Sequence, residues 1–99
     1  MTKTVICKIS EFPVGTAKKV TVEGKEIAVF NVDGEFYAIS NVCPHKGYSL
    51  SEGEVEEKKV ACPGHGWVFD LKTGNEQNLP VSVNKYNVSV EDENVLVET

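Results

Sequence analysis

The most informative pattern in this chain lies in CPHKGYSLSEGEVEEKKVACPGHGW, from Cys43 to Trp67. It contains both histidines and two of the three cysteines, arranged as Cys-x-His and then Cys-x-x-His. Thiolates and neutral imidazoles are ligands that transition metals prefer. We therefore predict a metal centre in this stretch, and its four ligands are Cys43, His45, Cys62 and His65.

Short runs of alternating apolar and polar residues surround this stretch and predict β-strands. The clearest is a hairpin, IAVFNVDGEFYAIS, with Asp33-Gly34 as its two-residue turn. Further strands are expected in VICKI, in KKVTVEGKEIAVF around Glu23-Gly24, in WVFDL and in the last hairpin, YNVSVEDENVLVE. Because no segment keeps a helical period over a useful length, the fold class is predicted as all-β.

Between Val42 and about Gly66 the alternation gives way to prolines, glycines and charges, except in a short expected strand, Lys58–Ala61. We predict a single domain, 1–99, with a base formed by 1–41 and 67–99 and an insertion of about 42–66. A weakly apolar insertion has little core of its own, so metal binding would supply folding energy there.

Composition excludes several classes of function. The chain has 99 residues, a net charge of -5 and no basic cluster, so nucleic acid is not an expected partner. It contains no apolar run long enough to span a bilayer and its first residues do not resemble a signal peptide, which predicts a cytoplasmic protein without a membrane partner. An odd cysteine count in a reducing compartment favours thiols or metal ligands.

Two cysteines and two histidines suit either one zinc ion or a two-iron two-sulfur cluster with histidines on one iron. A zinc finger usually takes a cysteine pair from one segment and a histidine pair from a helix, whereas here each segment supplies one of each. Glycines would let the backbone approach a cluster and leave amides free to donate to its sulfides. Gly47, Gly64 and Gly66 are placed for that role.

The boxes CPHKG and CPGHGW, separated by the sixteen residues between His45 and Cys62, resemble the ligand boxes of the Rieske family. The flanking text resembles small Rieske-type ferredoxins and the Rieske domains of ring-hydroxylating oxygenases over nearly the whole chain. The resemblance implies a Rieske-like β-sandwich base domain with an inserted cluster-binding subdomain and one 2Fe-2S cluster. It also implies cysteines on the buried iron and histidines on the iron near the surface.

The sequence departs from the Rieske proteins of respiratory and photosynthetic complexes. Those proteins join the two boxes by a disulfide, and the corresponding positions here are Tyr48 and Gly64. Their serine and tyrosine donors to the cluster correspond to Trp67 and Phe69. Because hydrogen bonds to the sulfurs stabilise the reduced form, their loss predicts a potential around -150 mV, near the low end of the Rieske range.

Other residues are expected to pack around the cluster, to lie at the surface or to have a structural role. Trp67 and Phe69 are expected to pack around the cluster, and Pro80 resembles the family's third loop, which covers it, although a plain turn explains this proline equally well. Lys46 is either a docking residue or a solvated lysine. Cys7 lies in an alternating strand and is expected to be a buried structural thiol.

The expected function is that of a soluble one-electron carrier. The resemblance implies the carrier's partners, because Rieske-type ferredoxins receive electrons from a flavin-dependent reductase and deliver them to a terminal oxygenase. Catalytic non-haem iron needs two further histidines and a carboxylate, and no histidine remains, so the chain is not expected to be an enzyme. Two alternatives stay open: a small redox subunit of a larger enzyme, such as assimilatory nitrite reductase, and a zinc-stabilised interaction module.

Overall fold

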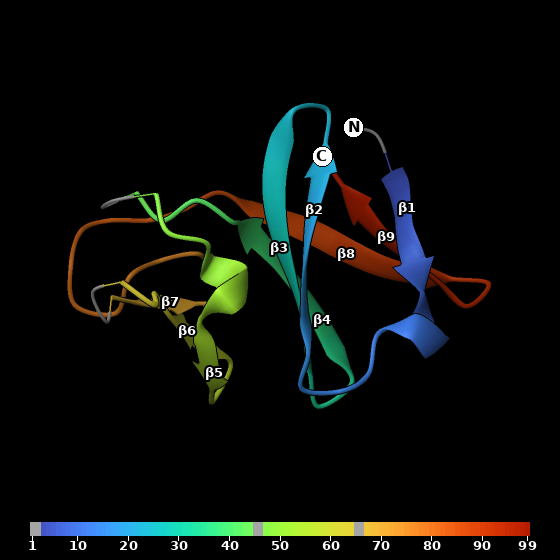
Figure 1. The fold of residues 1–99 in the computed structure, drawn as a ribbon, viewed down its shortest axis with the longest axis horizontal. Helices are drawn as coiled ribbons and strands as arrows, with labels where there is room; N and C mark the ends of the chain where they lie inside the picture. Colours follow the sequence, from blue (N-terminus) through green and yellow to red (C-terminus); the bar gives the residue numbers. More distant parts are fainter. Residues whose placement is uncertain (1–2, 45–46, 65–66) are drawn as a thin grey trace.

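The computed structural model describes residues 3–44, 47–64 and 67–99, and in these ranges the chain forms strands and two single-turn 3-10 helices. The elements in chain order are β1 (Lys3–Lys8), η1 (Ile9–Glu11), β2 (Ala17–Val22), β3 (Lys25–Val32), β4 (Glu35–Ser40), η2 (Leu50–Glu52), β5 (Glu54–Glu56), β6 (Lys59–Ala61), β7 (Val68–Asp70), β8 (Lys85–Glu91) and β9 (Asn94–Glu98). The predicted all-β class is confirmed. A six-stranded sheet, β1-β9-β8-β4-β3-β2, lies beside a three-stranded sheet, β5-β6-β7 (Figure 1).

The predicted hairpin at Asp33-Gly34 is confirmed. Val32 pairs with Glu35, and the two turn residues have φ angles of 53° and 89°. Positive φ at both positions gives a turn whose twist matches that of the flanking strands. The turn makes β3 and β4 antiparallel neighbours in the larger sheet.

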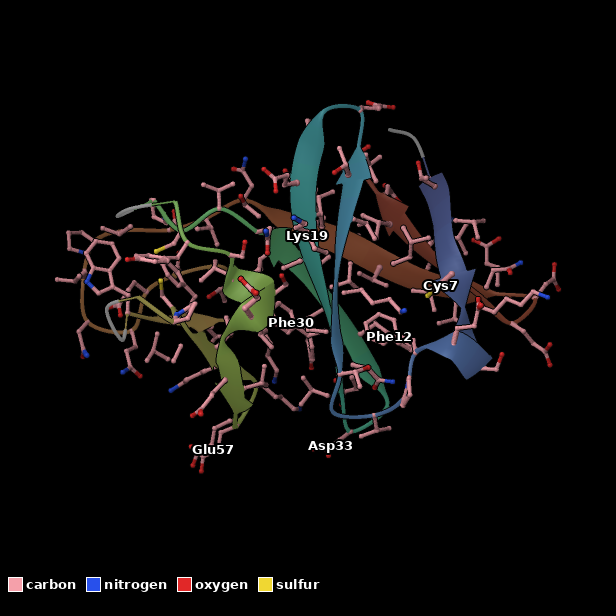
Figure 2. The ribbon with its side chains drawn as sticks, viewed as in Figure 1. Cys7, Phe12, Lys19, Phe30, Asp33 and Glu57 are labelled. Atoms are coloured by element: carbon pink, nitrogen blue, oxygen red, sulfur yellow. The ribbon has the colours of Figure 1, made fainter. Side chains whose placement is uncertain are left out.

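Strand β3 is buried on both faces, which explains its nearly continuous apolar run. Ile27 and Val29 belong to one core, whereas Ala28 and Phe30 belong to another. Figure 2 shows Phe30 on the side of β2 that faces η2 and Phe12 on the opposite side. Strand β3 therefore lies between two apolar cores.

The base core joins the two halves of the larger sheet, as expected for a β-sandwich-like base. Its buried residues are Phe12, Val22, Ile27, Val29, Ala38 and Val97. The junction core lies between the larger sheet and the smaller one. Its buried residues are Ala28, Phe30, Ile39, Cys43, Leu50, Val60, Cys62, Phe69 and Leu71.

Two features of the smaller sheet differ from the prediction. Strand β5 was not expected, because all three of its residues are exposed and its charged sequence carries no apolar pattern. The predicted base includes residues 67–70, yet Val60 of β6 pairs with Phe69 of β7, so β7 belongs to the smaller sheet. An alternating run shows that a strand forms but does not identify its partner.

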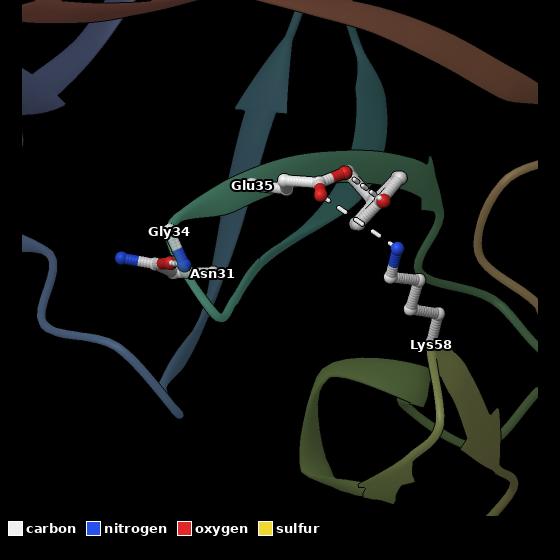
Figure 3. A network of polar contacts seen from close by, with 5 residues as sticks. Asn31, Gly34, Glu35 and Lys58 are labelled. Atoms are coloured by element: carbon white, nitrogen blue, oxygen red, sulfur yellow. Dashed lines mark hydrogen bonds and ion pairs between the residues drawn. The ribbon is translucent and has the colours of Figure 1, made fainter.

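A polar contact also connects the two sheets (Figure 3). The Tyr37 hydroxyl on β4 donates to Glu35 Oε2 at 2.5 Å, and Lys58 Nζ from the smaller sheet lies 3.6 Å from Glu35 Oε1. Because the Lys58 and Glu35 side chains are 36% and 60% exposed, water weakens this ion pair. The apolar contacts of the junction core therefore hold the sheets together.

The prediction that Cys7 is buried was wrong. Its side chain is half-buried on β1, which lies at the edge of the larger sheet and pairs there with β9. Partial burial still raises the pKa of the thiol, and Lys18 lowers it by a smaller amount. No helix in the described ranges is long and apolar enough to cross a membrane.

Candidate metal centre

Cys43 and Cys62 begin two loops that close in the same way. The Cys43 N–H donates to the Tyr48 carbonyl at 2.9 Å, and the Cys62 N–H donates to the Trp67 carbonyl at 2.6 Å. Each bond spans five positions, so both cysteines are fixed at the start of a short loop. In Figure 1 the two loops lie together at the end of the molecule farthest from β1.

The thiols of these two residues are buried in the junction core. Cys43 is 1% exposed and Cys62 is 2% exposed, and neither is joined in a disulfide. Leu50, Val60 and Phe69 belong to the same core. The fold therefore places the thiols of both loops in one core that excludes water.

The two loops touch through Tyr48 and Gly64. A Cβ added at Gly64 would overlap the Tyr48 ring at Cε2 and Cδ2 and lie 2.8 Å from Cζ. The ring therefore rests directly against the glycine backbone. This contact occupies the pair of positions at which the resemblance places a disulfide in other Rieske proteins.

A third loop, residues 76–83, lies against β7, the strand that follows the Cys62 loop, which we call the second loop. The Glu76 N–H donates to the Val81 carbonyl at 2.8 Å, and the Gln77 N–H donates to the Val68 carbonyl at 2.9 Å. The Glu76 side chain is only 8% exposed. Pro80 lies exposed in this loop, and no ligand contact is assigned to it.

The buried Glu76 carboxylate accepts three backbone hydrogen bonds. Val68 N–H donates to Oε2 at 2.8 Å, while Asn78 and Leu79 N–H donate to Oε1 at 2.5 Å and 3.0 Å. Burial acts to raise the pKa of Glu76, but the three N–H donors outweigh it and hold the pKa below its ordinary value. The carboxylate therefore stays ionised at neutral pH.

The structure places several of the predicted supporting residues around the thiols. Phe69 is fully buried in the junction core, and the half-buried Trp67 packs against that core, with its ring centroid 6.4 Å from that of Phe69. The Gly47 N–H donates to the Cys43 carbonyl at 2.8 Å. That amide is therefore not free for a sulfide, contrary to expectation, because it closes its own loop.

Four predicted site residues, His45, Lys46, His65 and Gly66, lie outside the described residues. Sequence reasoning missed Leu50 and Val60 in the core around the thiols and Glu76 in the third loop. The polar run that surrounds Glu76 has no period to mark a buried position. A carboxylate followed two and three residues later by loop N–H groups was the only available signal.

The donor set in the described part of the chain fits an iron-sulfur cluster. Such clusters are held by cysteine thiolates, and two thiols at the starts of matched loops can serve one iron. The surrounding apolar side chains keep water away from these sulfurs. Two further ligands would be needed, and the sequence supplies two histidines in the same loops.

Comparisons with known proteins agree with this donor set. The family model described as the Rieske [2Fe-2S] domain matches residues 2–93. The ferredoxin component of the naphthalene 1,2-dioxygenase system of Pseudomonas aeruginosa is 40% identical over 90 residues, covering 89% of this chain and 86% of that protein.

Two solved structures have closely similar folds. One comes from a complex of reduced oxygenase and oxidized ferredoxin in carbazole 1,9a-dioxygenase, with 33% identity, a TM-score of 0.88 and coverage of 96% of this chain and 100% of that chain. The other is assigned as an NADH-dependent nitrite reductase small subunit from Mycobacterium tuberculosis, with 28% identity, a TM-score of 0.91 and coverage of 97% and 93%.

Proposed function

This chain belongs to the Rieske [2Fe-2S] domain family, and from that membership we propose that it carries single electrons from a flavin-dependent reductase to a terminal oxygenase. Its cofactor is one 2Fe-2S cluster, which supplies one-electron reduction and oxidation when bound. The observation that carries the proposal is the burial of Cys43 and Cys62 in one core at the starts of two matched loops.

We assign four ligands to the cluster: Cys43, His45, Cys62 and His65. The two buried thiolates would hold the inner iron, and the histidines would hold the iron nearer the surface. The chain's own contribution is to fix both cysteines by backbone hydrogen bonds and to exclude water with Leu50, Val60 and Phe69. Lys46, Gly64, Gly66, Trp67 and Pro80 are proposed as neighbours of the cluster rather than as ligands.

A carrier role, without catalysis by this chain, is supported by its histidine count. A catalytic non-haem iron needs two histidines and a carboxylate in addition to the cluster ligands, and the sequence contains two histidines in all. The partners follow from relatives that are ferredoxin components of dioxygenase systems. We further propose a cytoplasmic location, because an odd number of cysteines, two of them proposed as metal ligands, suits a reducing compartment.

A second candidate function is the small redox subunit of a nitrite reductase. The fold similarity to the M. tuberculosis protein favours it, since that protein matches over nearly the full length of both chains. Co-purification with a large flavin or haem subunit would support this candidate. Rapid oxidation of the reduced chain by a ring-hydroxylating oxygenase would support the carrier role instead.

The first test is the EPR spectrum of anaerobically purified protein reduced with dithionite. We expect a rhombic signal with the low average g of a histidine-ligated two-iron cluster, and two irons and two sulfides per chain. Cys43→Ser should abolish the signal, whereas Cys7→Ser is the matched control, because Cys7 packs against the base core instead. Folded, colourless protein that contains zinc and no sulfide would overturn the proposal and establish the zinc module.

A further inference from the structure

Glu76 connects to Cys62 through a single peptide group. The Cys62 N–H donates to the carbonyl oxygen of Trp67, at 2.6 Å. The same peptide unit continues to the Val68 N–H, which donates to Glu76 Oε2 at 2.8 Å. The buried carboxylate, the peptide group and the Cys62 amide therefore form one continuous hydrogen-bond chain.

Such a chain strengthens each of its members. A carboxylate that accepts a bond from an N–H polarises that peptide group and makes its carbonyl oxygen a better acceptor. Hydrogen bonds to an ionised acceptor are also stronger than neutral ones.

The other oxygen of the carboxylate fixes the third loop. Oε1 accepts the N–H groups of Asn78 and Leu79, two exposed residues of the third loop. One side chain thus joins this loop to the strand that leaves the second loop. A neutral or shorter residue could not accept bonds on both oxygens over the same reach.

We propose that Glu76 is a positioning residue that holds the third loop against the loop that begins at Cys62. Its carboxylate also places a permanent negative charge beside the cluster site. The proposal rests on the proposed function, because it takes Cys62 as a ligand. A negative charge there opposes addition of an electron, so Glu76 would keep the reduction potential low.

The test uses Glu76→Gln, with Glu56→Gln as the control. Glutamine keeps the shape of the side chain, but only one of its two terminal atoms can accept a hydrogen bond, so the Val68 bond or the loop bonds must be lost. Glu56 lies exposed on β5, and its replacement changes the net charge of the protein by the same amount. Both variants are made in the complete chain with its cofactor.

Amide exchange and reduction potential are measured together. In Glu76→Gln we expect peptides that cover Val68 or Asn78 and Leu79 to exchange at least about tenfold faster, which corresponds to one lost hydrogen bond to a charged group. The reduction potential should rise in Glu76→Gln by more than in Glu56→Gln. Unchanged exchange, or equal potentials in the two variants, would overturn the proposal.

Two provisions keep the test decisive. If Glu76→Gln does not fold, exchange in the parent protein decides: the Asn78 and Leu79 amides should exchange at least about tenfold slower than in an unstructured peptide, and unprotected amides would refute the clamp. If the parent binds no cluster, the electron-carrier proposal fails at that point. The exchange measurement still reports separately on the clamp.

Discussion

The contact between Tyr48 and Gly64 makes a sharp prediction for Gly64→Ala. The added Cβ would overlap Cε2 and Cδ2 of the tyrosine ring, so the ring must leave its place. Overpacking costs about 1 to 3 kcal/mol, and we expect the lower end because the Tyr48 side chain is 43% exposed and can rotate outward. A loss of about 1 kcal/mol lowers the melting temperature of a domain of this size by roughly 4 to 8 °C.

The assay is thermal unfolding of the cofactor-loaded protein in a double-mutant cycle with Tyr48→Ala. Once the ring is absent, alanine at position 64 has nothing to displace, so the double variant should be about as stable as Tyr48→Ala alone. The φ angle of Gly64 is not in the left-handed region, so alanine adds no backbone strain there. Additive losses, or a Gly64→Ala variant as stable as the parent, would refute the contact.

The remaining predictions concern the cofactor, the polar contact in Figure 3 and the base. A redox-dye titration should give a potential around -150 mV, and a value well above zero would contradict the missing sulfur donors. Phe69→Tyr should raise that potential if its hydroxyl reaches a cysteine sulfur; if it does not, the fully buried hydroxyl should instead destabilise the protein by about 1 to 3 kcal/mol in urea unfolding. The hydrogen bond to Glu35, followed by burial, raises the pKa of Tyr37 to about 12, so one of the three tyrosines should ionise late in an ultraviolet titration. Because this folded-state pKa lies above the unfolded one near 10, the stabilisation is complete below about pH 10 and is lost as the pH rises towards 12. Glu35→Gln should move that tyrosine back towards the others, and an unchanged titration curve would show that the hydrogen bond is absent. Asn31→Ala should cost about 1 to 3 kcal/mol in urea unfolding, because Asn31 Nδ2 donates to the Phe12 carbonyl at 2.7 Å and the loss leaves that carbonyl unpaired; a variant as stable as the parent would contradict this.

Local chemistry made much of the fold predictable. The Asp33-Gly34 turn needs positive φ at two successive positions, which few dipeptides supply at low cost, so the hairpin was evident from two letters. The two cysteine loops were predictable in the same way, because the proline and glycine residues near each cysteine oppose both helix and strand. These signals act over a few residues and survive without tertiary context.

Strand partnership and long-range contacts were not predictable in this way. The run Val68–Asp70 was recognised as part of a strand, but its pairing with β6 depends on how two sheets meet at the junction core. Strand β5 forms because its backbone pairs with that of β6, although its residues are exposed and two of the three are charged. Cys7 is half-buried because β1 lies at the edge of the sheet, which an alternating pattern does not reveal.

The fold class, the positions of the two cysteine loops and the candidate cysteine and histidine ligands could all be predicted from the order of residues alone. Only the tertiary structure brought the Cys43 and Cys62 thiols into one buried core, laid Tyr48 on Gly64 and turned Glu76 inward to a peptide group of the second loop. The physical reason is one of range. Turn and ligand chemistry are properties of neighbouring residues, whereas burial and hydrogen bonding between loops depend on chain segments that only folding brings together.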